Sequence, residues 1–144
     1  MMNYEKELKD AYGEIIETFH LKLIIISGED FLLIGSEYAL YISIYHDELN
    51  LWYIYRDAQG DLLMDLIDFY ISEKSETFDR WGIIPAQTCA GRIKNGLIIT
   101  ARILKNHFSN ILEGDKSWIE EYKKKNGDFD KPSKKLAQIV EKYF

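Results

Sequence analysis

The sequence is poor in the residues that fix a chain covalently or anchor it in a membrane. Its single cysteine, Cys89, excludes an intrachain disulfide and a thiolate-rich zinc site. No apolar run approaches the roughly 20 residues that a helix needs to cross a bilayer. The N-terminal stretch MMNYEKELKD is charged from its fifth residue and lacks the apolar segment of a signal peptide. We therefore expect a cytoplasmic protein without a membrane segment.

Histidines are few, and none has a partner at a metal-binding spacing such as His-x-x-x-His: they are His20, His46 and His107. Asp47 and Glu48 follow His46 directly, but adjacent residues rarely converge on one ion. Cys89 lies 18 residues before His107. On one continuous helix that spacing places them on the same face but about 27 Å apart, at ~1.5 Å per residue. We expect no metal site and no cysteine–histidine pair.

No other catalytic motif stands out. The acidic part of the chain contains carboxylate pairs, including Asp57 with Asp61 and Asp65 with Asp68, but nothing marks one pair as a general acid and base. The sequence has no phosphate-binding glycine loop, nucleophile elbow or dinucleotide fingerprint. We therefore expect no catalytic residues, no cofactor and no enzymatic activity.

What the sequence does contain is apolar character and an uneven charge. Apolar residues make up 47% of the chain, so a folded core is expected. Residues 29–79 hold 12 acidic and 2 basic side chains, whereas residues 80–144 hold 13 basic and 7 acidic ones. The net charge of −6 therefore hides an acidic middle and a basic C-terminal half.

The middle of the chain predicts strands, because apolar and polar side chains alternate over Tyr38 to Tyr45 and over Leu49 to Arg56. With Asp47-Glu48 as the loop, Ile44 lies opposite Leu51, and a four-residue loop keeps the same parity. One face then carries the core residues Leu40, Ile42, Ile44, Leu51, Tyr53 and Tyr55. Two further strands are expected at residues 21–27 and 31–35, and a fifth if residues 62–64 add one.

Helical spacing of apolar residues predicts helices outside this meander. We expect one at Tyr4 to Phe19 with Asn3 as its N-cap and a long stripe from Ile93 to Leu112. Residues 65–71 fit either a short helix or a strand, and the acids at their start favour the helix. A short helix around Trp118 to Tyr122 and a terminal helix after Pro132 follow. The sequence thus predicts a single α+β domain over residues 1–144, with an antiparallel sheet of four or five strands.

The face opposite the predicted core suggests a binding surface. Aromatic rings on a strand face, surrounded by charge of one sign, suit a protein interface in which rings anchor and acids steer a basic partner. The candidate partner-binding residues are Tyr41, Tyr45, Trp52, Asp47, Glu48, Asp57 and Asp61. The alternative is that helices cover the rings and that the acids serve solubility.

A nucleic-acid partner would have to use the basic C-terminal half, near Trp118 and Tyr122. The lysines there are Lys123, Lys124, Lys125, Lys131, Lys134 and Lys135. Proteins that grip phosphates tend to be basic throughout the domain, whereas this chain has a pI of about 5.1. A solvated helix face is therefore the preferred interpretation, and nucleic acid is not the expected partner.

Two stretches together resemble immunity proteins of bacterial polymorphic toxins, including those paired with contact-dependent growth inhibition toxins. They are ALYISIYHDELNLWYIYRDAQGDLLMDLIDFYI and the helical ARILKNHFSNILEGDKSWIEEY, within a pattern spanning roughly Phe31 to Tyr122. Such families vary in fold and share no catalytic residues, so the resemblance transfers no site residue. It implies a small cytoplasmic protein that binds and neutralises a cognate toxin, often a basic nuclease.

The sequence therefore predicts a protein-binding module with a basic protein partner, such as a nuclease toxin. The main alternative is a small enzyme or ligand-binding protein with a pocket between sheet and helices.

Overall fold

The computed structural model describes residues 2–144 and has an antiparallel sheet at its centre. The strands are β1 (Lys22–Ser27), β2 (Asp30–Ile34), β3 (Tyr38–Tyr45), β4 (Glu48–Arg56) and β5 (Leu62–Leu66). Strands that follow one another in the chain are neighbours in the sheet, in the order β1-β2-β3-β4-β5. The predicted α+β class is confirmed, and the fifth strand is present.

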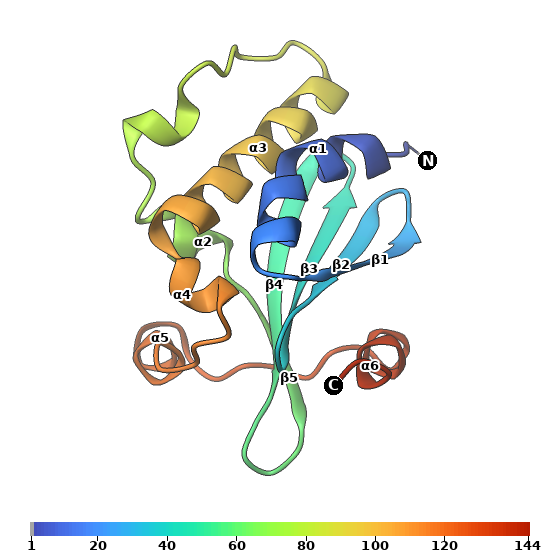
Figure 1. Cartoon of the computed structure of the whole chain (residues 1–144), viewed down its shortest axis with the longest axis vertical. Coiled ribbons are helices and arrows are strands. Elements are labelled where there is room, and N and C mark those ends of the chain that lie inside the picture. Colours follow the sequence, from blue (N-terminus) through green and yellow to red (C-terminus); the bar gives the residue numbers. More distant parts are fainter. Residues whose placement is uncertain (1) are drawn as a thin grey trace.

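Helices cover both faces of this sheet. They are α1 (Glu5–Thr18), α2 (Asp68–Ser72), a 3-10 turn η1 (Thr77–Arg80), α3 (Cys89–His107), α4 (Ser109–Leu112), α5 (Ile119–Asn126) and α6 (Lys134–Glu141). α1 to α5 lie on one face, and α6 lies alone on the other (Figure 1). No helix within residues 2–144 is long and apolar enough to cross a membrane.

The β3–β4 hairpin closes one residue earlier than predicted. Tyr45 pairs with Glu48, so His46 and Asp47 form a two-residue turn, and Ile44 lies opposite Leu49. His46 has a φ of 56°, in the left-handed region that tight hairpin turns require. The predicted pairing of Ile44 with Leu51 is therefore wrong by two residues. Because the shift is even, each side chain stays on its predicted face.

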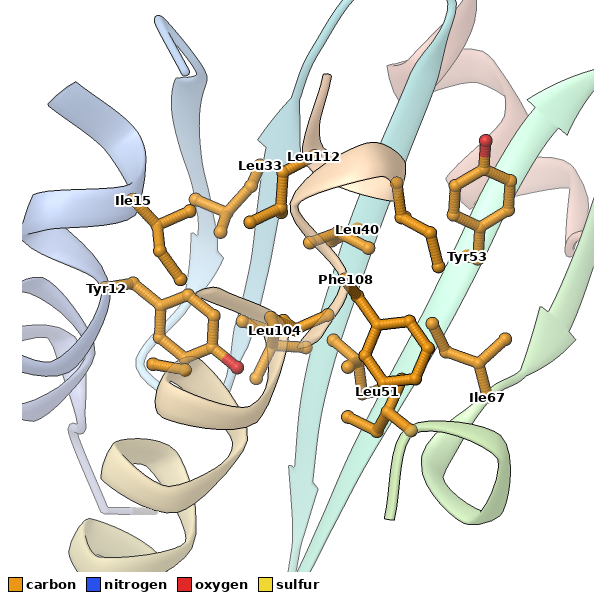
Figure 2. Packing of buried hydrophobic residues seen from close by; sticks show 14 of the residues in the cluster. Tyr12, Ile15, Leu33, Leu40, Leu51, Tyr53, Ile67, Leu104, Phe108 and Leu112 are labelled. Carbon is orange, nitrogen blue, oxygen red and sulfur yellow. The ribbon is translucent and has the colours of Figure 1, made fainter. Parts of the chain in front are cut away.

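The main core lies on the face predicted for it. Leu40, Leu51 and Tyr53 are each 1% exposed or less and pack beneath α1, α3 and α4 (Figure 2). α3 approaches closely at Gly96, where an added Cβ would lie 3.1 Å from Leu49 Cδ2. Gly96 thus allows the longest helix to rest directly on β4, which accounts for a glycine inside a helix.

A second, smaller core lies on the opposite face. Leu136 and Val140 of α6 pack against a patch of the sheet formed by Leu32, Ile34, Ala39, Ile54 and Leu62. Ser133 caps this helix, since its side chain accepts a hydrogen bond from the Leu136 amide. The terminal helix therefore docks as its apolar stripe predicts.

Two element boundaries differ from prediction. The expected helix at residues 65–71 is split, because β5 continues to Leu66 and α2 begins only at Asp68. The long helix ends at His107, because Phe108 leaves helical geometry with φ −134° and ψ 35°. At the N-terminus, the predicted N-cap is wrong by one residue: Tyr4 is the N-cap of α1 and its side chain makes no capping bond, while Asn3 Oδ1 accepts a hydrogen bond from the Glu5 amide at 2.9 Å.

Two stacked core tyrosines give a test of this packing. Tyr38 donates a 2.7 Å hydrogen bond to the Leu112 carbonyl, whereas no group of residues 2–144 bonds the buried Tyr53 hydroxyl. We expect Tyr38→Phe to lower the free energy of unfolding by about 1–2 kcal/mol and Tyr53→Phe to leave it unchanged or raise it by up to ~1 kcal/mol. Urea denaturation measures both, and equal losses would contradict the packing.

Candidate protein-binding surface

The predicted aromatic face lies opposite the main core. Tyr41 pairs with Trp52 across β3 and β4, and Tyr45 pairs with Glu48 at the turn. All four side chains project from the face that α6 also occupies. This follows from strand alternation, since the residues that alternate with them on β3, Leu40, Ile42 and Ile44, enter the main core.

Helix α6 covers only half of that face. The buried residues that it packs against lie toward the β4–β5 turn, and the half near the β3–β4 turn extends past one side of the helix, which Figure 1 shows end-on. Tyr45 is consequently 68% exposed, while Tyr41 and Trp52, nearer to α6, are half-buried. We call this half, with Asp30, Tyr41, Ser43, Tyr45, Glu48, Asn50 and Trp52, the open half-face.

A groove of about 360 Å³ runs between α6 and the open half-face. Its walls include Tyr41 and Trp52 on the sheet and Lys135 and Ile139 on the helix. Inside it, the Tyr41 hydroxyl donates a 2.7 Å hydrogen bond to Asp30 Oδ1. Burial, with the hydrogen bond to this carboxylate, raises the pKa of Tyr41, so the hydroxyl keeps its proton and holds the ring in place.

Asp30 is a member of the surface that sequence analysis missed. Its other carboxylate oxygen accepts a 2.8 Å hydrogen bond from Ser27, which fixes the β1–β2 turn. Asp30 pairs with Ser43 across β2 and β3. The sequence signal was an acidic residue at the start of a strand, and only the strand pairing shows that it lies beside Tyr41.

The four predicted acids separate into two groups. Asp47 and Glu48 are exposed in the β3–β4 turn, and Asp47 lies 3.8 Å from Arg92 of α3. Asp57 and Asp61 belong to the β4–β5 turn, at the other end of β4. β4 spans nine residues, or about 30 Å at ~3.4 Å per residue. Asp57 Oδ1 accepts hydrogen bonds from the amides of Gln59 and Asp61, so it stabilises its own turn.

A shallow hollow of about 580 Å³ adjoins the open half-face at the β3–β4 turn. Tyr45, His46 and Asp47 line it from the turn, while Tyr4 and Cys89 line it from α1 and α3. The exposed Cys89 thiol lies 3.5 Å from the His46 carbonyl oxygen. Cys89 and His107 sit at opposite ends of α3, as their spacing predicts.

No metal-binding cluster accompanies this hollow. Across residues 2–144, no three His, Cys, Asp or Glu side chains are grouped so that they could hold a metal ion. His46 therefore contributes to the turn through its backbone conformation and to the surface through its ring, which packs against Tyr45 with centroids 4.2 Å apart.

The Asp65 and Asp68 pair is split between two structural roles. Asp65 accepts a 2.6 Å hydrogen bond from the Tyr122 hydroxyl, and Asp68 accepts a 2.7 Å hydrogen bond from the Leu51 amide. Burial raises the pKa of Asp68 to about 6, although the Leu51 amide favours its ionised form.

A buried carboxylate that the sequence did not reveal holds the α2–α3 connection. Asp79 is 0% exposed and accepts hydrogen bonds from the Glu76 amide and from Asn106, while His107 Nε2 lies 2.9 Å from it. Burial alone would raise the pKa of Asp79, but these bonds outweigh it and the pKa lies below its ordinary value. The segment carrying exposed Trp81 is therefore tied to the end of α3.

Comparisons of the chain with protein-family models, with curated proteins and with solved structures each find no significant match.

The raised pKa of Asp68 predicts a pH-dependent stability. The unfolded chain releases this proton near pH 4 and the folded chain near pH 6, so the stabilisation is complete below pH 4 and lost as pH rises through about 6. Asp68→Asn keeps an acceptor for the Leu51 amide and cannot ionise. The free energy of unfolding of the wild type, minus that of the variant, should fall by up to about 3 kcal/mol between pH 4 and pH 7.

Exposed Asp61→Asn is the matched control for this measurement, since its side chain is solvated. The depressed pKa of Asp79 gives the opposite slope in every variant and cancels from the difference. If the wild type and Asp68→Asn differ by the same amount at both pH values, Asp68 titrates normally in the folded chain.

Proposed function

We propose that this chain is a protein-binding module whose open half-face grips a basic protein, and that the partner is a toxin that the chain neutralises. The observation that carries the proposal is the 68% exposed ring of Tyr45 on a sheet face that α6 leaves uncovered. A large aromatic side chain on a flat surface loses little entropy when it is buried by a partner, which is why tyrosine and tryptophan dominate binding hot spots.

Charge around the ring supports a basic partner. The β1–β2 and β3–β4 turns lie at the same end of the sheet, because Asp30 pairs with Ser43. They bring four acids to the edge of the open half-face: Glu29, Asp30, Asp47 and Glu48. Acidic rims of this kind accelerate the approach of a positively charged protein and suppress acidic competitors.

The groove beside α6 offers a place for one cationic side chain of the partner. The rings of Trp52 and Tyr41 and the carboxylate of Asp30 line it on the sheet side, opposite Lys135 of α6. A lysine or arginine that enters such a site gains both ring contact and charge pairing. We therefore assign the groove the role of an anchor pocket within a larger interface.

The nucleic-acid alternative finds less support. Trp118 and Tyr122 are 7% and 3% exposed, so their rings are not free to stack on bases. The lysines of α5 and those around α6 lie on opposite faces of the sheet, since α5 packs in the main core and α6 in the smaller one. A single phosphate-tracking stripe would need them on one side.

A small-ligand function is the second candidate, and the same groove favours it. Its volume of about 360 Å³ lies within the range of ligand pockets. The two functions separate experimentally: a ligand site needs Trp52 and Asp30 but is indifferent to Asp47 and Glu48, whereas a protein interface uses all four.

The binding proposal predicts a specific kinetic effect. Where the reading frame next to this chain encodes a large secreted protein, the probe is the C-terminal domain of that protein. Asp47→Lys/Glu48→Lys should slow its association with the chain by about tenfold at low ionic strength and flatten the salt dependence of the rate. Stopped-flow fluorescence measures both quantities.

The matched control is Asp61→Lys/Asp128→Lys, which changes the net charge equally and replaces exposed acids away from the open half-face. It should reduce the rate far less. Tyr45→Ala should instead speed dissociation, because it removes an anchor without changing charge. The interface lies elsewhere if the control slows association as much as Asp47→Lys/Glu48→Lys, and the toxin assignment is lost if no such domain binds.

A further inference from the structure

The two edge strands of the sheet, β1 and β5, differ in whether another segment of the chain pairs with them. At β5, the chain after α5 returns and pairs with the strand: the Met64 amide donates to the Asp130 carbonyl at 2.6 Å, and the Asp130 amide donates to the Met64 carbonyl at 3.0 Å. β1 forms the other edge (Figure 1). Among residues 2–144, no further segment forms a bridge to β1.

The backbone groups that β1 turns outward can be identified from the ladder. The Gly35 amide bonds the Tyr38 carbonyl and the Ile44 amide bonds the Glu29 carbonyl, so the odd-numbered residues of β2 face β3. The even-numbered residues of β2 therefore face β1, and they pair with Lys22, Ile24 and Ser27. Leu23 and Ile25 consequently direct their amide and carbonyl groups away from the sheet.

Between Leu23 and Ile25, this edge lacks the features that usually keep edge strands from pairing. It contains no proline, its one charge is Lys22 at the start, and three isoleucines follow Leu23. Ile25 is 42% exposed, and the register shift that interrupts the strand comes only after it. Soluble proteins normally protect an apolar edge of this kind with charge, a bulge or a covering element.

We infer that β1 pairs antiparallel with β1 of a second copy of this chain, so that the two sheets become one. The pairing that uses every outward group sets Leu23 of each copy opposite Ile25 of the other. Four inter-chain hydrogen bonds then form, and Ile24 of one copy faces Ile24 of the other across the two-fold axis.

The strand is self-complementary, and this argues for a second copy as the occupant. Leu23 and Ile25 share the α1 side of the sheet and Ile24 lies on the α6 side, so each cross-strand pair joins apolar side chains. Antiparallel pairing also keeps the two Lys22 side chains apart. Each is directed toward the end of the opposing strand where Glu29 and Asp30 follow Ser27. The Lys22 ammonium lies over the Tyr143 ring of its own chain, 4.9 Å from the centroid, so it does not crowd the seam.

Such a dimer leaves the open half-face free. The two-fold axis stands perpendicular to the joined sheet, so both copies present their α6 side, with Tyr45, in the same direction. Self-association is thus independent of the proposed toxin binding.

Sedimentation velocity of the full chain tests the inference. We expect the apparent mass of the wild type to rise from 16.9 kDa toward twice that value as its concentration is raised to about 200 μM. Ile25→Lys places a charge on the exposed edge and should give the monomer at the same concentrations. Ile84→Lys makes the same change at an 81% exposed residue outside the sheet and should leave the dimer intact.

The register is tested separately by cross-linking in a Cys89→Ser background. Cysteines at position 24 face each other in a non-hydrogen-bonded pair with Cα atoms about 4.5 Å apart, which a disulfide can span. Ile24→Cys should therefore form a disulfide-linked dimer on mild oxidation, whereas Leu23→Cys, whose counterpart is residue 25, should not. A wild type that stays monomeric throughout the concentration range, or a dimer that Ile25→Lys leaves unchanged, would overturn the inference.

Discussion

The tight turn between β3 and β4 is the constraint on which the molecule depends. His46 takes a left-handed conformation, Tyr45 pairs with Glu48, and alternation then assigns every side chain of both strands to one face or the other. On one side this produces the wall against which α1 and α3 pack. On the other it aligns Tyr41, Tyr45 and Trp52. Core and candidate surface are therefore two consequences of one register, and a slip of one residue would exchange them.

The sheet face opposite the main core matters because α6 covers one half of it and leaves the other half open. α6 is short, and the buried sheet residues that its apolar side chains contact lie mainly in the half nearer the β4–β5 turn. The uncovered half keeps exposed aromatic area together with a rim of carboxylates, a combination that solubility alone does not require. Asp30 belongs to both the aromatic and the acidic part of this surface, since it orients Tyr41 through a hydrogen bond and adds charge to the rim.

Sequence reasoning succeeded where a local rule was sufficient. Alternation over Tyr38 to Tyr45 and Leu49 to Arg56 predicted the faces, because face assignment tolerates an even error in register. It failed where the burial of a residue depends on segments that are distant in the sequence. The apolar stripe of α6 does not indicate how much of the sheet the helix covers. Asp79 is buried because the fold places it against Asn106 and His107 at the end of α3.

The most direct test is hydrogen–deuterium exchange of this chain alone and bound to the proposed partner, a basic toxin domain. The account predicts slower exchange at the β3–β4 turn and along residues 41–52, with the β4–β5 turn and α5 unchanged. Protection confined to the β4–β5 turn or to α5, with residues 41–52 exchanging as in the free chain, would contradict it.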